Sequence, residues 1–101
     1  MTMSSGRLVL RTDLSLEGRR EFIETARAAI TDAEIAGTEV ELDCSRVETL
    51  GQIDDPVIGM LVTLARVAQR RGARVAVVNA PERMRAQLEA AQIAHFFDWQ
   101  G

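Results

Sequence analysis

The fold class of this chain is decided by residues 38–78, which read TEVELDCSRVETLGQIDDPVIGMLVTLARVAQRRGARVAVV. Residues 38–44 alternate between apolar and polar side chains, and the apolar ones are Val40, Leu42 and Cys44. A period of two with one charged face is typical of a strand that packs on helices with one face and meets water with the other. This segment is therefore predicted to be a strand.

The rest of the stretch predicts a helix and then a second strand. The run DDP at 54–56 places carboxylates where a helix cap lies and proline at the favoured first helical position. The helical spacing continues to about Arg71 and stops at Gly72, a residue suited to the left-handed turn that ends many helices. Residues 73–78 are rich in valine and alanine and predict a strand.

The same alternation continues outward along the chain. A short apolar run at 8–10 predicts a strand, and apolar spacings of three and four predict a helix over 16–36. A third helix is expected from about 80–82, and the apolar tail at 93–99 is expected to pack back onto the core. The order β, α, β, α, β, α with short connections implies an α/β fold: a mainly parallel sheet with helices packed mostly on one face.

Length and composition indicate one domain. The chain has 101 residues, of which 47% are hydrophobic, so residues 1–101 are expected to form a single domain, with 1–6 as a flexible N-terminus. A lone cysteine, Cys44, cannot form an internal disulfide, which fits a reducing compartment. The N-terminus has no apolar segment typical of a secretory signal, and no apolar run approaches the roughly 20 residues that span a bilayer. A cytoplasmic protein is expected.

Charge and aromatic content make nucleic acid an unexpected partner. The chain has 12 basic and 15 acidic residues, a net charge of −3. Only four residues carry a phenyl or indole ring: Phe22, Phe96, Phe97 and Trp99. The sequence therefore lacks the basic, aromatic-bearing surface that nucleic-acid binding usually requires.

The start of the second predicted helix is apolar almost all the way round. Residues 57–62 carry no charged side chain, whereas polar residues recur from Thr63 onward. A helix that packs on a sheet with one face should show polar residues every third or fourth position, so the first turn and a half is predicted to expose apolar surface. Such surface is typical of a docking site for a partner. The alternative is that the preceding loop or the C-terminal tail covers this turn.

Two carboxylates, Asp54 and Asp55, precede that turn. A helix N-terminus carries unpaired N–H groups and a partial positive charge, so it stabilises an anion there. The simplest alternative is that one carboxylate is a helix cap. Paired carboxylates can also perform acid–base or metal chemistry, but no third ligand or nucleophile lies nearby in the sequence.

The other chemically capable side chains favour no reaction. Cys44 at a strand end is expected to be a small buried hydrophobe. His95, the single histidine, has no Cys or Asp partner at ligand spacing. We therefore expect no catalytic residue, no metal and no cofactor.

Three segments together resemble the STAS family (sulfate transporter and anti-sigma factor antagonist). They are residues 41–47, ELDCSRV, residues 54–61, DDPVIGML, and residues 73–81, ARVAVVNAP. The family pattern is a hydrophobic-Asp-hydrophobic-Ser-Gly-Val strand, then Asp-Ser-Ser-Gly-Leu-Gly, a helix, a glycine, and a strand ending before Pro-Glu. The likeness covers about residues 38–99, with a looser match from 8 to 30. The resemblance implies a non-enzymatic domain that regulates by binding other proteins.

The resemblance also implies a role for position 55. In regulatory family members an anti-sigma kinase phosphorylates the serine after the first Asp of the motif, and the unphosphorylated form binds the kinase. Placing Asp54 on the motif Asp and Gly59 on its second Gly puts Asp55 on that serine, while Pro56 and Val57 replace the next Ser and Gly. Asp55 is not a serine-type phosphate acceptor, and its single charge imitates phosphoserine only partly.

The alternative to a lost phosphorylation site is one displaced to another residue of this chain. The loop at 48–53 is longer than the family's usual connection, and hydroxyl groups lie at Ser45 and Thr49. If phosphorylation has moved rather than disappeared, these are the expected acceptors.

These features predict a binding module whose partner-contacting residues are Asp54, Asp55, Val57, Ile58, Gly59 and Met60. The resemblance favours an anti-sigma factor antagonist that regulates transcription by partner switching, with an anti-sigma factor or kinase-like ATPase as partner. An alternative within the family is an accessory subunit that docks on an ABC transporter ATPase. From another class, a small-nucleotide binder or enzyme remains open, with no residue set behind it.

Overall fold

The computed structural model describes residues 7–47 and 53–100. The elements in chain order are β1 (Arg7–Val9), α1 (Leu16–Ala36), β2 (Val40–Asp43), α2 (Asp55–Arg71), β3 (Val75–Val78), α3 (Glu82–Ala90), the 3-10 turn η1 (Ala94–Phe96) and β4 (Asp98–Trp99). The predicted alternation of strands and helices is confirmed. β4 is an addition, formed where the apolar tail reaches the free edge of β3.

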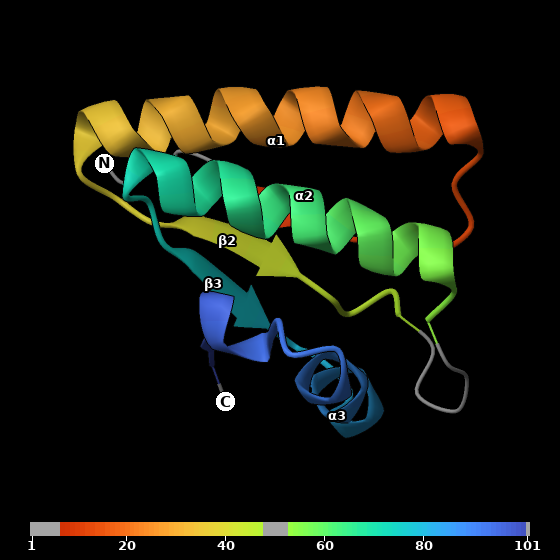
Figure 1. Ribbon diagram of the computed structural model, residues 1–101. Coiled ribbons are helices and arrows are strands. Elements are labelled where there is room, and N and C mark those ends of the chain that lie inside the picture. Colours follow the sequence, from red (N-terminus) through yellow and green to blue (C-terminus); the bar gives the residue numbers. More distant parts are fainter. Residues whose placement is uncertain (1–6, 48–52, 101) are drawn as a thin grey trace.

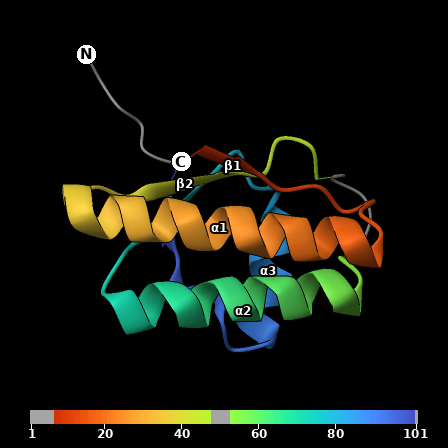
Figure 2. The same ribbon diagram turned by 90° about the horizontal axis from the view of Figure 1, so that it is seen from above.

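The sheet has the strand order β1-β2-β3-β4, and every neighbouring pair is parallel. Figures 1 and 2 show α1 and α2 side by side over one face of this sheet, with α3 on the same side. Strand register sorts the side chains into rows across the sheet, because alternate residues of a strand point to opposite faces. The row on the helix side is Leu8, Leu42, Val77 and Trp99, and the next row, on the outer face, is Arg7, Glu41, Ala76 and Asp98.

Local sequence sets the helix ends. The Ser15 hydroxyl oxygen caps α1 by accepting a hydrogen bond from the Gly18 N–H at 3.1 Å. α1 and α2 end at Gly37 and Gly72, whose φ angles of 70° and 67° lie in the left-handed region that glycine adopts without steric cost. Both predicted helix ends are confirmed.

The core lies between the helices and the sheet. Its largest fully buried side chains include Leu10, Ile30, Leu42, Leu61, Leu64, Met84 and Leu88. Burying each such side chain contributes roughly 1.5–3 kcal/mol. The tail packs onto this core through Ile93, Ala94 and Phe97, as predicted, and the Trp99 indole N–H donates to the Ala94 carbonyl at 2.9 Å. Across the described ranges, no helix combines the length and apolar character needed to cross a membrane.

Candidate partner-binding site

The two carboxylates at the start of α2 are exposed, and neither acts as a cap. Asp54 occupies the cap position, and its backbone carbonyl accepts from the N–H groups of Val57 and Ile58 at 2.9 and 3.1 Å. Its side chain, however, makes no capping hydrogen bond. Asp55 is the first helical residue and Pro56 the second, one position later than predicted for the proline. Both carboxylates lie at the N-terminal, positive end of the helix dipole, and both are accessible from outside.

The predicted exposure of the first apolar turn is wrong for Val57 and Met60, which are only 3% and 4% exposed. The physical reason is helical spacing: Val57, Met60, Leu61 and Leu64 recur at intervals of one, three and four and form the buried face of α2. The outer part of the same turn carries the half-buried Ile58 and the exposed Gly59. A turn that is apolar all round thus divides into a core face and a surface face.

Gly59 is a helix-interior glycine that the fold itself does not require. A Cβ atom built at this position would meet no atom of the described residues within 4 Å. Glycine in a helix interior costs about 1 kcal/mol relative to alanine. The Gly59 carbonyl accepts a hydrogen bond from the Thr63 hydroxyl at 3.1 Å. The glycine therefore leaves helix backbone accessible to an approaching molecule.

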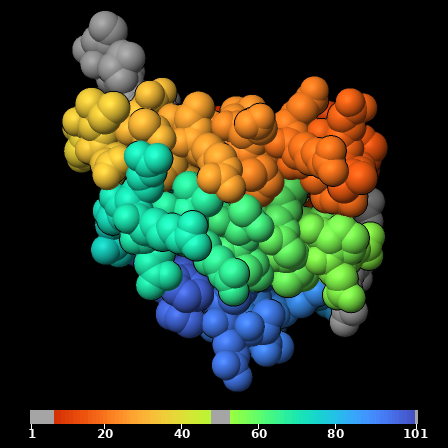
Figure 3. All heavy atoms as spheres, turned by 45° about the horizontal axis from the view of Figure 1, so that its top comes forward, coloured from red at the N-terminus to blue at the C-terminus, as the bar shows by residue number. Residues whose placement is uncertain are grey.

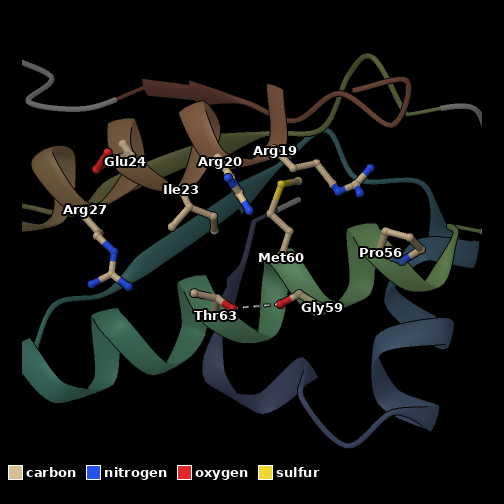
Figure 4. Close-up of a pocket in the computed structure, with 9 residues that line it drawn as sticks. All are labelled: Arg19, Arg20, Ile23, Glu24, Arg27, Pro56, Gly59, Met60 and Thr63. Atoms are coloured by element: carbon tan, nitrogen blue, oxygen red, sulfur yellow. Dashed lines mark hydrogen bonds between the residues drawn. The ribbon is translucent and has the colours of Figure 1, made fainter. Parts of the chain in front are cut away.

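A groove of about 430 Å³ runs between α1 and α2, beside Gly59. Figure 3 shows the face on which these two helices pack together, and Figure 4 shows the groove from close by. Its lining is Arg19, Arg20, Ile23, Glu24 and Arg27 from α1, with Pro56, Gly59, Met60 and Thr63 from α2. Of the residues predicted to contact a partner, the groove brings together Gly59 and Met60. Asp54, Asp55, Val57 and Ile58 lie outside its lining.

The α1 wall of this groove was not among the residues predicted from the sequence to contact a partner. Arg20, Ile23 and Arg27 lie at helical spacings of three and four, so they share one face of α1. That spacing was a visible signal. Its meaning depended on α2 packing alongside, which the spacing within one helix does not specify.

A second polar cluster lies at the end of β2 and supports the turn that leaves the sheet. Asp43 is 7% exposed, and its carboxylate accepts hydrogen bonds from the Ser45 backbone N–H at 3.0 Å, the Asn79 amide at 3.2 Å and the Arg7 guanidinium at 2.8 Å. The Ser45 N–H, followed by the Asn79 amide, holds the pKa of Asp43 well below its usual range. The charged Asp43 carboxylate therefore has a structural role, holding the turn after β2 through these three hydrogen bonds.

Cys44 and His95 lie at separate places in the fold, Cys44 directly after β2 and His95 in η1. Cys44 is fully buried, and burial, reinforced by the neighbouring Asp43 charge, raises its pKa to about 12. Its thiol therefore stays protonated near neutral pH and is a poor nucleophile. His95 is exposed, with its ring centroid 4.2 Å from that of Phe96. Among residues 7–47 and 53–100, no three His, Cys, Asp or Glu side chains are grouped to hold a metal ion.

Of the two alternative phosphate acceptors, Ser45 and Thr49, the structure describes Ser45. Ser45 is exposed at the turn after β2, and its backbone N–H is held by Asp43. Thr49 lies outside the described residues.

Comparison with known proteins gives one match. A family model described as "Mlab, STAS domain" matches residues 1–98 of the chain. No curated protein matches the chain, and no solved structure matches it. The matched range spans every described helix and strand except the last residue of β4.

Proposed function

Because the chain belongs to the STAS domain family, we propose that it is a regulatory module that binds a partner protein through the exposed start of α2. At the family level, such domains are binding modules rather than enzymes. The proposed contact residues are Asp54, Asp55, Ile58 and Gly59. Val57 and Met60 are proposed to support this surface from beneath, since both are buried.

The observation that carries the proposal is Gly59. An exposed glycine near the start of a helix lowers stability, and the described residues give no packing reason for it. Its functional advantage is close approach, because a partner can pack directly against helix backbone where no Cβ intervenes. Exposed carboxylates at Asp54 and Asp55 lie one turn away and offer charged acceptors for donors on that partner.

The first candidate partner is an anti-sigma factor or kinase-like ATPase, as the resemblance to anti-sigma factor antagonists implies. In that role Asp55 replaces the phosphorylatable serine, so binding is governed by the partner's abundance or nucleotide state. Regulation of transcription would then proceed without a phosphate cycle at position 55.

The second candidate is an accessory subunit that docks on an ABC transporter ATPase, and one observation favours it. Residues 54–62 contain no serine or threonine, so the start of α2 has no hydroxyl to phosphorylate. A surface that is not covalently switched suits lasting attachment to an assembly better than cyclic release. The absence of a hydroxyl group from residues 54–62 therefore supports a persistent docking role.

The experiment that tests this function is affinity purification of the tagged chain from its source cells, with Gly59→Arg as the test variant. An arginine at this exposed position is tolerated by the fold but blocks close approach, so recovery of the partner should fall at least about tenfold. Ile35→Arg is the matched control, because Ile35 is 80% exposed and lies near the C-terminal end of α1. A histidine-kinase-like ATPase would favour the first candidate, and an ABC ATPase the second. Equal recovery by wild type and Gly59→Arg would contradict the docking surface.

A further inference from the structure

The groove between α1 and α2 joins an apolar floor to a basic rim. Ile23 and Met60 supply apolar side chains, while Arg19, Arg20 and Arg27 supply guanidinium groups from α1. Figure 4 shows Arg20 and Arg27 extending from α1 toward α2, with Ile23 between them, whereas Glu24 points away from α2. The groove therefore presents cations on both sides of an apolar site.

Two of these cations have no acidic partner in the described part of the chain. Five other arginines there form ion pairs with carboxylates: Arg7, Arg11, Arg71, Arg74 and Arg85. Arg20 and Arg27 form none with the described residues. Arg19 is engaged through its Nη1, which donates to the Leu14 carbonyl at 3.1 Å. Arg20 and Arg27 are thus available to anions supplied from outside.

The spacing of these two arginines indicates the shape of that anionic ligand. Arg20 and Arg27 lie seven positions apart on α1, which places their backbones about 10 Å apart along the helix axis. That spacing matches two carboxylates two turns apart on a helix. Between them, the apolar floor at Ile23 and Met60 fits an aliphatic or aromatic side chain of the same helix.

We propose that this groove binds an acidic amphipathic helix of the partner protein, with its carboxylates on Arg20 and Arg27 and its apolar side chain over Ile23 and Met60. The inference rests on the proposed docking function and specifies the chemistry of the docked segment. Gly59 lies at the α2 side of the groove, where it gives the bound helix close access to the α2 backbone. The charge complementarity of the basic rim makes an acidic segment the occupant.

Photocrosslinking in the source cells tests the occupant directly. Benzoylphenylalanine is placed at Thr63 in the groove, at Ile58 on the start of α2 and, as a control, at Ile35. We expect the Thr63 probe to crosslink a protein whose modified peptide, mapped by mass spectrometry, is an acidic amphipathic helix. A Thr63 crosslink to a neutral or basic segment, or a partner crosslink from Ile58 alone, would overturn the inference and leave the docking function standing. No protein crosslink at either position would contradict both.

A synthetic peptide of the crosslinked segment then tests the two cations. In calorimetric titration, Arg20→Glu/Arg27→Glu should weaken peptide binding by about tenfold or more. The control Arg66→Glu/Arg70→Glu changes net charge equally outside the groove and should alter binding by no more than about twofold. Equal affinity of wild type and Arg20→Glu/Arg27→Glu would refute the proposed pairing. Binding to phosphatidylglycerol vesicles that depends on Arg20 and Arg27, without a protein crosslink at Thr63, would identify a lipid ligand and also overturn it.

Discussion

Removing the Asp43 carboxylate should destabilise the protein more than removing any exposed carboxylate. Its side chain accepts the Ser45 backbone N–H, the Asn79 amide and the Arg7 guanidinium. A hydrogen bond to a charged group contributes about 1.5–3 kcal/mol, and the half-exposed Arg7 adds little because solvent screens it. We therefore expect Asp43→Ala to lower the free energy of unfolding by about 2–4 kcal/mol, a large part of the 5–15 kcal/mol typical of a domain.

The same carboxylate should make stability depend on pH in a defined direction. Because the folded state lowers the pKa of Asp43, its stabilising contribution is fully present above the unfolded value of about 3.9 and is lost as the pH falls through the folded value. The Asp43→Asn variant keeps the side-chain volume but has no charge to lose. The stability difference between wild type and Asp43→Asn should consequently be largest near pH 7 and shrink as the pH falls below 4.

Urea unfolding followed by circular dichroism at several pH values provides the measurement. Glu41→Gln is the matched control, since Glu41 pairs with the same Arg7 but is more exposed, and its loss should cost under about 1 kcal/mol. A loss of unfolding free energy in Asp43→Ala no larger than that of this control would contradict the structural role of the Asp43 carboxylate. A stability difference between wild type and Asp43→Asn that stayed constant from neutral to acidic pH would equally refute it.

Other expected outcomes follow from burial and charge in α2 and at the end of β2. Met60→Ala should lower the free energy of unfolding, measured in urea, by about 2–5 kcal/mol, and Ile58→Ala should lower it clearly less. The reverse order would contradict the assignment of Met60 to the buried face of α2 and Ile58 to its outer face. After incubation with ATP and a cognate kinase, mass analysis should show no phosphate at Asp55. Asp55→Ser should change the free energy of unfolding by under about 1 kcal/mol and should bind a kinase-type partner more tightly. Equal affinities of wild type and Asp55→Ser for that partner in calorimetry would contradict the idea that Asp55 imitates phosphoserine. Gly59→Ala should raise the free energy of unfolding by about 0.5–1 kcal/mol while weakening partner binding, and unchanged binding would argue against close approach there. Cys44 should resist a thiol reagent at pH 8 until urea is added, because burial raises its pKa to about 12; rapid reaction of the folded protein would show an accessible thiolate.

Local sequence determined the order and ends of most elements. The two-residue alternation in β2 and the glycines that follow α1 and α2 act within a few residues of the features they specify. Alternating strands and helices with short connections then left a parallel sheet as the expected topology, because parallel strands require a crossover. β4 was not predicted, because its two residues, 98–99, are too few to show the two-residue alternation of a strand.

Tertiary packing decided which side of each element reached the surface. An all-apolar turn at the start of α2 has no polar residue to mark its outer face, so only its packing against the core identified Val57 and Met60 as buried. Likewise, the buried Asp43 is bound by Arg7 and Asn79, each 36 residues away in sequence, and no local pattern predicts those contacts.

The groove depended most strongly on the tertiary structure. The 3.6-residue period of α1 places Arg20 and Arg27 on one face of that helix, and the sequence alone contained this information. It did not contain the choice of neighbour, since a helix face can pack against any complementary surface. Only the packing of α2 beside α1 brought Arg20 and Arg27 to the same groove as Gly59 and Met60.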